Sequence, residues 1–298
     1  MRTLRTVAEL RSALAEAHRA GRVIGLVPTM GALHDGHLSL IRRARADCDE
    51  VVVSLFVNPI QFGEPADLAG YPRDERRDAA LASQAGADHL FAPPVKEVFP
   101  AGFATSVTVE GVSGTLEGAH RARGHFDGVS TVITKLFNMV APQIAYFGQK
   151  DVQQTLVIKR LVADLDLPVA IVVCPTVREP DGLAMSSRNA RLSRAERVRA
   201  AALHRALRAV QEAVDAGEAD PAPVIAGARA ELSSSDLEPE YLELVAVDTL
   251  TPVDRIDGDV LAVVAARVGA TRLIDNQLIH AGPVQHEQQE EEMCSARC

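Results

Sequence analysis

Two histidines lie three positions apart just after a short apolar run. His34 and His37 belong to the stretch VPTMGALHDGH, together with Gly31 and Gly36. The run before them predicts a buried strand and the stretch after them a helix, so both imidazoles would stand at a helix N-terminus. That end carries unpaired N–H groups and partial positive charge, which suit a phosphate. Imidazoles add hydrogen bonds to phosphoryl oxygens, stronger ones when charged, so the spacing favours an anion site over a capping histidine with a chance neighbour.

Other polar groups follow other predicted elements. Lys150 and Asp151 come directly after the run IAYFG; the lysine suits a phosphate, and the aspartate could accept from ribose hydroxyls. Ser186, Ser187 and Arg188 lie in GLAMSSRNARLS and offer two hydroxyls and a planar guanidinium. Taken singly, the first pair predicts only a surface ion pair and the second group only the segment that caps the following helix.

Strands and helices alternate from residue 22 to about residue 175. Strands are predicted in RVIGLVP, VVVSLFVNP, HLFAP, SVTVE, IAYFG and PVAIVVCP. Helices are predicted in HLSLIRRARADC, DERRDAALASQAG, GVSTVITKLFNMVAP and VQQTLVIKRLVADLD, and a capping box from Thr6 to Glu9 begins an earlier one. Continuous apolar strands indicate a parallel sheet covered by helices on both faces, with ligands at the carboxyl ends of the strands near a switch point.

The pattern changes after residue 175. One long helix, SRAERVRAAALHRALRAVQEAV, and a second, APVIAGARAELSS, precede three strand candidates, YLELVAV, VLAVVAARV and TRLIDN. We therefore expect a first domain over 1–175, a smaller α+β domain over 176–284, and a disordered tail over 285–298, where the chain is polar and aperiodic.

Composition narrows the class of protein. The chain has 298 residues, 47% of them hydrophobic and 24% charged, with a formal net charge of −9. Such a balance is typical of a soluble globular protein and argues against a long nucleic-acid partner. The chain has neither a signal-peptide pattern nor a run of the roughly 20 apolar residues that a membrane span needs. Four cysteines without metal-ligand spacing predict reduced thiols, so we expect a cytoplasmic protein without membrane contact.

The motifs taken together resemble one family. HxGH after the first strand of a doubly wound sheet is similar to the nucleotidylyl-transferase superfamily. VPTMGALHDGHLSLIR, SLFVNPIQF, YPR, GHFDGVSTVITKLFN, FGQKDVQQ and TVREPDGLAMSSRNARLS, in this order, resemble the pantoate–β-alanine ligase family. The resemblance implies a Rossmann-like doubly wound parallel sheet domain with a smaller C-terminal α+β lid domain. It also implies a homodimer that uses ATP as substrate, with Mg²⁺ held mainly through the ATP phosphates.

The implied reaction has two steps. The pantoate carboxylate attacks the α-phosphorus of ATP, which gives pantoyl adenylate and pyrophosphate; the amine of β-alanine then displaces AMP and forms pantothenate. Because a carboxylate and a triphosphate repel each other in a dry pocket, the site must supply positive charge and hydrogen-bond donors.

The resemblance also implies a role for individual residues. The catalytic set is His34, His37, Lys150 and Arg188, with His37 as proton donor. The ATP-binding set is Met30, Gly31, His34, Gly36, His37, Gly148, Gln149, Lys150, Asp151, Val177, Met185, Ser186, Ser187 and Arg188. The set for pantoate and β-alanine is Met30, Asn58, Gln61 and Gln154, whose amides can both donate to and accept from a small hydroxylated acid. No protein ligand for a metal is assigned.

The chain departs from the family pattern in three places. Gln149 stands where the family has glutamate in GEKD, and the acids after YPR read DERRD. RARGHF is one residue longer than the family's RPGHF, so the arginine facing the substrate is either Arg121 or Arg123. The lone His125 of this segment is predicted to be structural.

Two other functions remain to be separated from a ligase. A transferase that joins AMP to a phosphorylated acceptor shares HxGH but has no need of Gln61 and Gln154. A nucleotide-sensing module on the same sheet has little need of both histidines together with Lys150 and Arg188. A tRNA synthetase is disfavoured by the length of the chain and by the absence of a basic anticodon-binding domain.

Overall fold

The computed structural model describes residues 1–63, 68–121 and 124–281, and these fall into two compact units. The first is Met1–Arg191, and the second begins at Leu192. The division lies sixteen residues after the boundary expected at 175, because the segment that follows the last strand folds back onto the first unit. The Arg191 guanidinium, for example, donates to the Gly70 carbonyl at 3.0 Å. The segment 285–298, expected to be a tail, lies outside the described residues.

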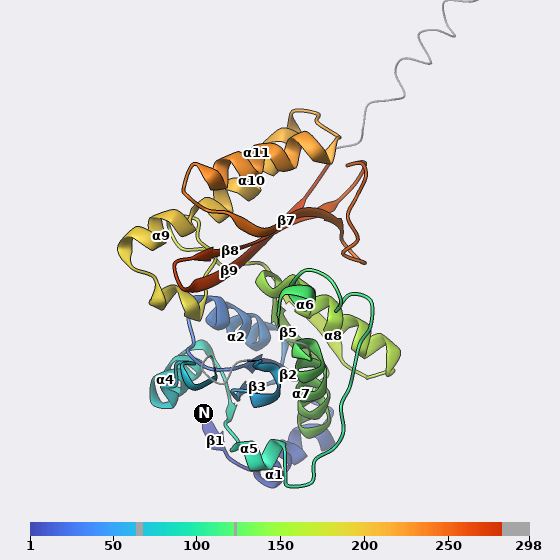
Figure 1. Ribbon diagram of the computed structural model, residues 1–298. Helices are drawn as coiled ribbons and strands as arrows, with labels where there is room; N and C mark the ends of the chain where they lie inside the picture. The colour runs from blue at the N-terminus through green and yellow to red at the C-terminus, as the bar shows by residue number, and fades with distance from the viewer. Residues whose placement is uncertain (64–67, 122–123, 282–298) are drawn as a thin grey trace, which may run out of the picture. The chain divides into compact units, whose positions relative to one another are not determined.

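The first unit is built on a six-stranded parallel sheet (Figure 1). Its strands lie in the order β1 (Arg2–Leu4), β4 (His89–Phe91), β3 (Glu50–Leu55), β2 (Ile24–Thr29), β5 (Ile144–Gly148) and β6 (Ala170–Cys174). From β2 the chain first adds strands on one side and later returns to add β5 and β6 on the other. The switch point of the sheet therefore lies between β2 and β5, whose carboxyl ends carry HxGH and GQKD.

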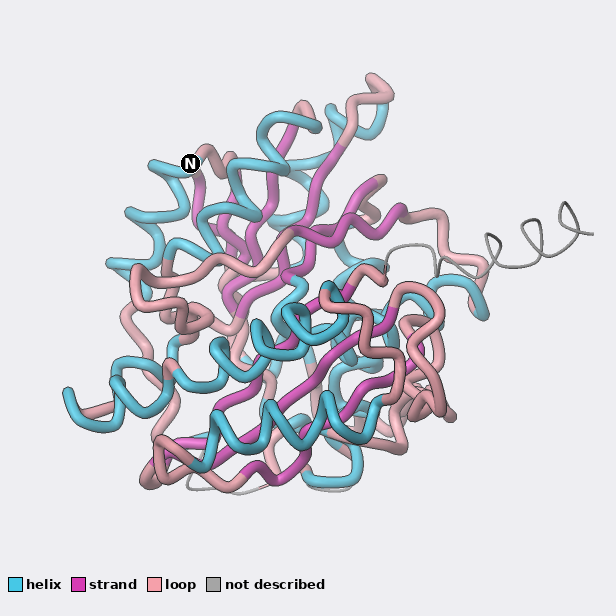
Figure 2. Tube along the Cα trace, turned by 90° about the horizontal axis from the view of Figure 1, so that it is seen from above, coloured by secondary structure: helices cyan, strands magenta, loops and turns pink. Residues whose placement is uncertain are grey.

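Helices cover both faces of this sheet, as expected. The helices of the first unit include α1 (Val7–Arg19), α2 (Asp35–Asp47), α4 (Glu75–Ala85), α5 (Val95–Val98), α6 (Glu117–His120), α7 (His125–Val140) and α8 (Val152–Asp164). One core joins α1, α7 and α8 to side chains such as Leu26 and Val52, and the other joins α2 and α4 to Val27 and Val53. Adjacent strand residues thus enter opposite cores, which is why these strands are apolar throughout. Figure 2 shows the strands flanked by helices.

One expected strand is absent, and one observed strand was not expected. The run SVTVE forms no strand; the Val107 N–H donates to the Thr131 hydroxyl at 2.9 Å instead of to a neighbouring strand. Conversely, the unpredicted β1 pairs with β4 through three residues. A three-residue edge strand is too short to carry a hydrophobic period.

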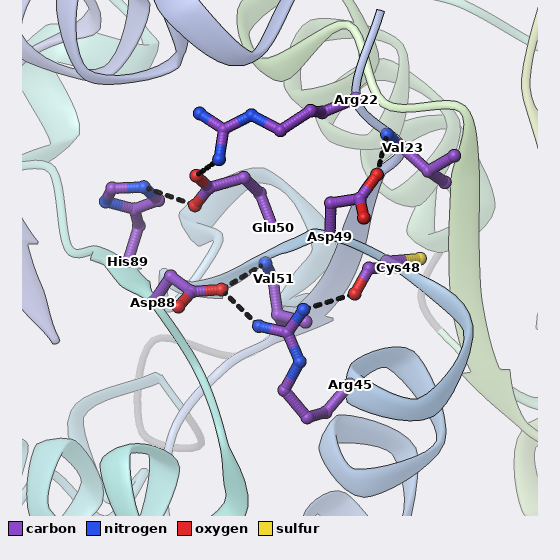
Figure 3. Close-up of polar contacts among 9 residues, drawn as sticks. All are labelled: Arg22, Val23, Arg45, Cys48, Asp49, Glu50, Val51, Asp88 and His89. Carbon is purple, nitrogen blue, oxygen red and sulfur yellow. Dashed lines mark hydrogen bonds and ion pairs between the residues drawn. The ribbon is translucent and has the colours of Figure 1, made fainter.

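The amino ends of the strands are joined by a network of polar contacts (Figure 3). Glu50, at the start of β3, lies 2.9 Å from an Arg22 nitrogen and 3.2 Å from His89 Nε2. Asp88 accepts from the Val51 N–H at 2.8 Å and from the Arg45 guanidinium at 2.7 Å. Because the strands are parallel, this network lies at the edge of the sheet opposite to HxGH and GQKD, so it stabilises the sheet away from the candidate site.

The second unit is smaller and α+β, as predicted. It contains α9 (Arg194–Ala200), α10 (Ala202–Asp215) and α11 (Pro221–Ser233), followed by an antiparallel sheet of β7 (Pro239–Ala246), β8 (Val260–Val268) and β9 (Thr271–Ile279). Within this unit, Figure 1 shows α10 and α11 side by side along the three strands. The capping box of Ser193 and Glu196 is present, but the helix expected as one piece is interrupted at Ala201. No helix among the described residues is both long and apolar enough to cross a membrane.

Candidate functional site

The two histidines stand at the N-terminus of α2, directly after the loop that leaves β2. His34 is the N-cap residue, and its N–H lies 3.4 Å from Nδ1 of His37. The ring centroids of His34 and His37 are 4.1 Å apart. A Cβ on Gly36 would lie 2.9 Å from both Nδ1 and Cε1 of His34. The glycine of HxGH therefore leaves room for the His34 imidazole, in the way that we expected for a flat ring.

Burial makes both imidazoles neutral near pH 7. It lowers the pKa of His34 to about 4 and that of His37 to about 3. The positive charge of Lys150 lowers both pKa values further, while Asp151 opposes the shift, so all four groups lie within electrostatic reach of one another. Because Nδ1 of His37 accepts a hydrogen bond, its proton is on Nε2. The donors at this site are thus neutral N–H groups in the protein without substrate, not the charged ones considered from the sequence.

One polar atom of the pair has no partner. Nδ1 of His34 is shielded from solvent and makes no hydrogen bond within the described residues. Such a group costs free energy until something pairs with it. An approaching phosphoryl group would supply acceptors beside the unpaired N–H groups of the first turn of α2.

A second cluster contains the residues expected to bind pantoate. Nδ2 of Asn58 donates to Oε1 of Gln61 at 2.9 Å, and Nε2 of Gln61 lies 3.2 Å from the sulfur of Met30. Asn58 is buried, and its Oδ1 has no hydrogen-bond partner among the described residues. Nδ1 of His125 donates to the Gln61 carbonyl at 2.8 Å, a contact of the kind that a structural histidine makes. The amides are thus held in place, and one buried acceptor stays unpaired among the described residues.

The helix α7 packs against this cluster. Gly128 packs against the 3₁₀ turn Pro59–Gln61, where a Cβ would lie 2.7 Å from the Ile60 carbonyl oxygen and 2.8 Å from the Gln61 nitrogen. The Gly128 carbonyl also accepts from Nδ2 of Asn58 at 3.0 Å. Only a residue without a side chain allows the helix to come this close.

The carboxyl end of β5 carries the next group. Gln149, Lys150 and Asp151 form a 3₁₀ turn between β5 and α8. Nζ of Lys150 is largely buried and lies 3.9 Å from a carboxylate oxygen of Asp151, which is half exposed. A Cβ on Gly148 would meet no atom within 4 Å, so the backbone there faces open space. Gln154 is half-buried on the first turn of α8.

The segment that begins at Val177 folds back on itself and approaches α2. The Met185 N–H donates to the Val177 carbonyl at 2.9 Å, and the Cβ of Met185 lies 3.8 Å from the position of a Cβ on Gly36. A 3₁₀ helix then runs from Ser187 to Arg191. Ser187 hydrogen-bonds the phenol of Tyr71, whose pKa is raised by burial. The hydroxyl of Ser186 accepts from the Arg188 N–H at 3.2 Å. The structure therefore brings the serine segment next to HxGH.

Of the two candidate arginines, only Arg121 lies within the described residues. Nε of Arg121 donates to the buried carboxylate of Glu117 at 2.7 Å. Gln153 fixes the preceding loop, since it accepts from the Glu117 N–H at 2.9 Å and donates to the carbonyls of Val112 and Thr115 at 2.8 and 2.7 Å. Arg123 lies outside the described residues, so both arginines remain candidates.

The acids after YPR have structural roles. Asp74 caps α4 by accepting from the Arg77 N–H at 3.0 Å, and Glu75 pairs with Arg5. Asp78 is buried and accepts from two backbone N–H groups of the β2–α2 loop. Across the described part of the chain, no three His, Cys, Asp or Glu side chains are grouped so that they could hold a metal ion.

Sequence reasoning missed Asp78 and Gln153 as residues that shape this site. Asp78 lies on the buried face of α4, in line with Ala82 and Ala85. An acid at an apolar position of a helix is a signal that could have found it, because a buried carboxylate must have partners. Gln153 gives no such signal, since QQ fits an exposed first turn equally well.

Comparison with known proteins agrees with the motifs. The model of the family "Pantoate-beta-alanine ligase" matches residues 2–278. The pantothenate synthetase of Cereibacter sphaeroides is 56% identical over 274 residues, which are 92% of this chain and 98% of the relative. That of Roseiflexus castenholzii is 53% identical over 94% of this chain and its own full length.

Two solved structures are similar throughout. Pantothenate synthetase from Thermus thermophilus has a TM-score of 0.89 and 48% identity, and the match covers 94% of this chain and 100% of that one. Pantoate-beta-alanine ligase from Francisella tularensis, complexed with beta-gamma ATP and beta-alanine, has a TM-score of 0.78 and 33% identity, with 93% and 97% covered. HxGH and GQKD lie at the switch point of the parallel sheet, and the family model and the relatives match nearly the whole chain. The chain therefore belongs to the pantoate–β-alanine ligase family.

Proposed function

We propose that this chain condenses pantoate with β-alanine at the expense of ATP and forms pantothenate, AMP and pyrophosphate through a pantoyl adenylate. The observation that carries the proposal is the convergence of His34, His37 and Lys150 at the switch point between β2 and β5. The Francisella ligase is complexed with beta-gamma ATP and beta-alanine, which supports ATP and β-alanine as substrates here too.

The phosphates of ATP would lie at the N-terminus of α2. The N–H groups of the first helical turn, the two imidazoles and the Lys150 ammonium offset the negative charge there. Each negative oxygen that approaches raises the pKa of the neighbouring imidazoles. Nε2 of His37 then acts as the proton donor to the phosphoryl oxygens. Arg188, together with Ser186, Ser187 and Met185, reaches the same phosphates.

The nucleoside would occupy the open space beside Gly148. Gln149 and Asp151 hold the ribose, and the backbone of Val177 contacts adenine. Gly31 and Gly36 allow the backbone to come close to the nucleotide.

Pantoate would lie on the amide cluster. Gln61 and Gln154 bind its hydroxyl and carboxylate groups, Asn58 and Met30 complete the pocket, and Arg121 or Arg123 neutralises its charge. The carboxylate attacks the α-phosphorus and the bond to pyrophosphate breaks. The amine of β-alanine then attacks the acyl carbon, loses a proton, and releases AMP.

Three further properties follow from the family resemblance. Mg²⁺ enters with ATP and is held through its phosphates, without a dedicated protein site. The protein forms a homodimer and acts in the cytoplasm.

A product assay tests the proposal. The purified protein is incubated with ATP, Mg²⁺ and pantoate, β-alanine, both or neither, and nucleotides and pantothenate are quantified. We expect AMP and pantothenate in equal amounts only when both acids are present. AMP transfer to a phosphorylated acceptor would support the rival transferase, and ATP binding without turnover would support the sensor; either result contradicts the proposal.

A further inference from the structure

One carboxylate holds the loop that carries the catalytic motif. Oδ2 of Asp78 accepts from the Ala32 N–H at 2.8 Å, and Oδ1 accepts from the Leu33 N–H at 2.8 Å. The Asp78 side chain comes from α4 and is only 1% exposed. A charge buried this deeply is tolerated because donors surround it. Here the donors are two consecutive amides of the β2–α2 loop.

The loop needs such a partner because its backbone is unfavourable. Gly31 and Ala32 have φ angles of +92° and +52°, both in the left-handed region. An alanine in that region costs roughly 1–2 kcal/mol. The turn points two successive N–H groups to the same side, where the carboxylate receives them. Asp78 thus offsets the strain of a conformation that the loop sequence does not favour by itself.

Arg77, the neighbour of Asp78 on α4, binds a backbone carbonyl of the same loop. Its guanidinium donates to the Leu33 carbonyl at 3.1 Å and lies 3.7 Å from Oδ1 of Asp78. Leu33 is therefore fixed at both its N–H and its carbonyl by neighbouring residues of α4. The next residue is His34, and Met30 lies just before the left-handed turn.

We propose that Asp78 is a positioning residue whose carboxylate fixes the loop 31–33. It thereby keeps His34, His37 and Met30 in the positions that they need when the pantoate carboxylate attacks ATP. The inference rests on the proposed function for its kinetic consequence, but not for the geometry of the clamp. Asp78 touches no reacting atom in this account. Displacements on the order of 1 Å can reduce turnover by about 10²-fold, so a loose loop lowers the rate even in a folded protein.

The chain provides a control carboxylate at the other end of the strands, with a side chain that is 37% exposed against 1% for Asp78. Asp88 also accepts a backbone N–H, that of Val51, and interacts with an arginine, but it lies at the amino ends of the strands (Figure 3). If a carboxylate of this kind only stabilises the fold, Asp78→Asn and Asp88→Asn should behave alike. If Asp78 positions the motif, only Asp78→Asn changes the kinetics.

The experiment measures both variants by steady-state kinetics, thermal unfolding and hydrogen exchange of the amides of Ala32 and Leu33. An asparagine has one side-chain oxygen, and its NH₂ group faces the second backbone donor. We expect Asp78→Asn to lower kcat about 10- to 100-fold, with a smaller change in KM for ATP, and to speed exchange at both amides. Asp88→Asn should lower the melting temperature but leave kcat, KM and this exchange within about twofold of the wild type.

Folded Asp78→Asn with wild-type kcat and unchanged exchange would overturn the inference. If that variant does not fold, Arg77→Met tests the same loop, because it changes a side chain that is largely exposed. It should speed exchange at Leu33 and lower kcat several-fold, and wild-type values for both would equally overturn the inference. If the wild-type protein itself does not form pantothenate, the proposed function fails, while the exchange measurement still decides whether Asp78 clamps the loop.

Discussion

At the residue scale, the position of the His34 imidazole depends on the absence of a side chain at Gly36. Gly36 has no side chain, and the His34 ring occupies the space beside it. Nδ1 of that ring is buried without a partner among the described residues, and burial holds the pKa of both imidazoles well below 6.5. A neutral, under-bonded donor pair costs little Coulomb energy beside Lys150. It gains charge-assisted hydrogen bonds when a phosphate arrives.

Gly36→Ala should separate activity from stability. The new Cβ would lie 2.9 Å from the His34 ring and push it aside, and we expect kcat to fall on the order of 10²-fold. Gly36 is the second residue of α2 and its φ is negative, so alanine suits the backbone, and the gain in helix stability is below the roughly 1 kcal/mol of a helix interior. Kinetics and thermal unfolding check this together. A melting temperature that falls along with kcat would contradict the account.

Much of this candidate site could be predicted from the sequence, because most of its residues belong to three short motifs. These are HxGH (34–37), GQKD (148–151) and MSSR (185–188). The neutral state of the histidines could not, since it depends on burial by elements distant in the chain. The role of Asp78 could not either, because its partners are backbone groups 45 and 46 positions away.

At the element scale, α7 positions the cluster of Asn58, Gln61 and Met30 through a close backbone approach. Gly128 meets the turn Pro59–Gln61, and His125, on the first turn of the same helix, holds the Gln61 carbonyl. The helix itself could be predicted from GVSTVITKLFNMVAP, although it begins at His125. The missing strand at SVTVE could not, because its polar and apolar residues alternate as in an edge strand, whereas the Val107 N–H donates to the Thr131 hydroxyl.

Gly128→Ala should disturb pantoate more than ATP. A Cβ there would lie 2.7 to 2.8 Å from backbone atoms of Ile60 and Gln61, which cannot rotate away. We expect a loss of about 1–3 kcal/mol in unfolding free energy and an increase of roughly tenfold in KM for pantoate, with KM for ATP changed less. Denaturant unfolding and KM for each substrate measure this. Equal increases in both KM values would argue against a selective role for the cluster.

At the scale of the whole molecule, buried histidines make the fold sensitive to acid. Burial lowers the pKa of His125 to about 4, as it does for His34, and that of His37 to about 3. The unfolded chain binds protons at these groups from about pH 6.5, whereas the folded chain does not. The stability they contribute is therefore complete above pH 6.5 and is lost as the pH falls towards 4.

Denaturant unfolding between pH 7.5 and 5 checks this effect. The unfolding free energy should fall through pH 6.5 to 5, above the range in which ordinary carboxylates titrate. Replacing His125 by glutamine should make that fall less steep. A free energy that does not change across this interval would contradict the pKa shifts.

In the proposed mechanism, pantoate attacks the α-phosphorus of ATP at the switch point of the sheet, before β-alanine is needed. Exchange of labelled pyrophosphate into ATP, measured without β-alanine, tests it most directly. We predict exchange that requires pantoate, and that is lost with pantoate present when His37 is replaced by alanine. Exchange without pantoate, or none with pantoate while pantothenate still forms, would contradict it.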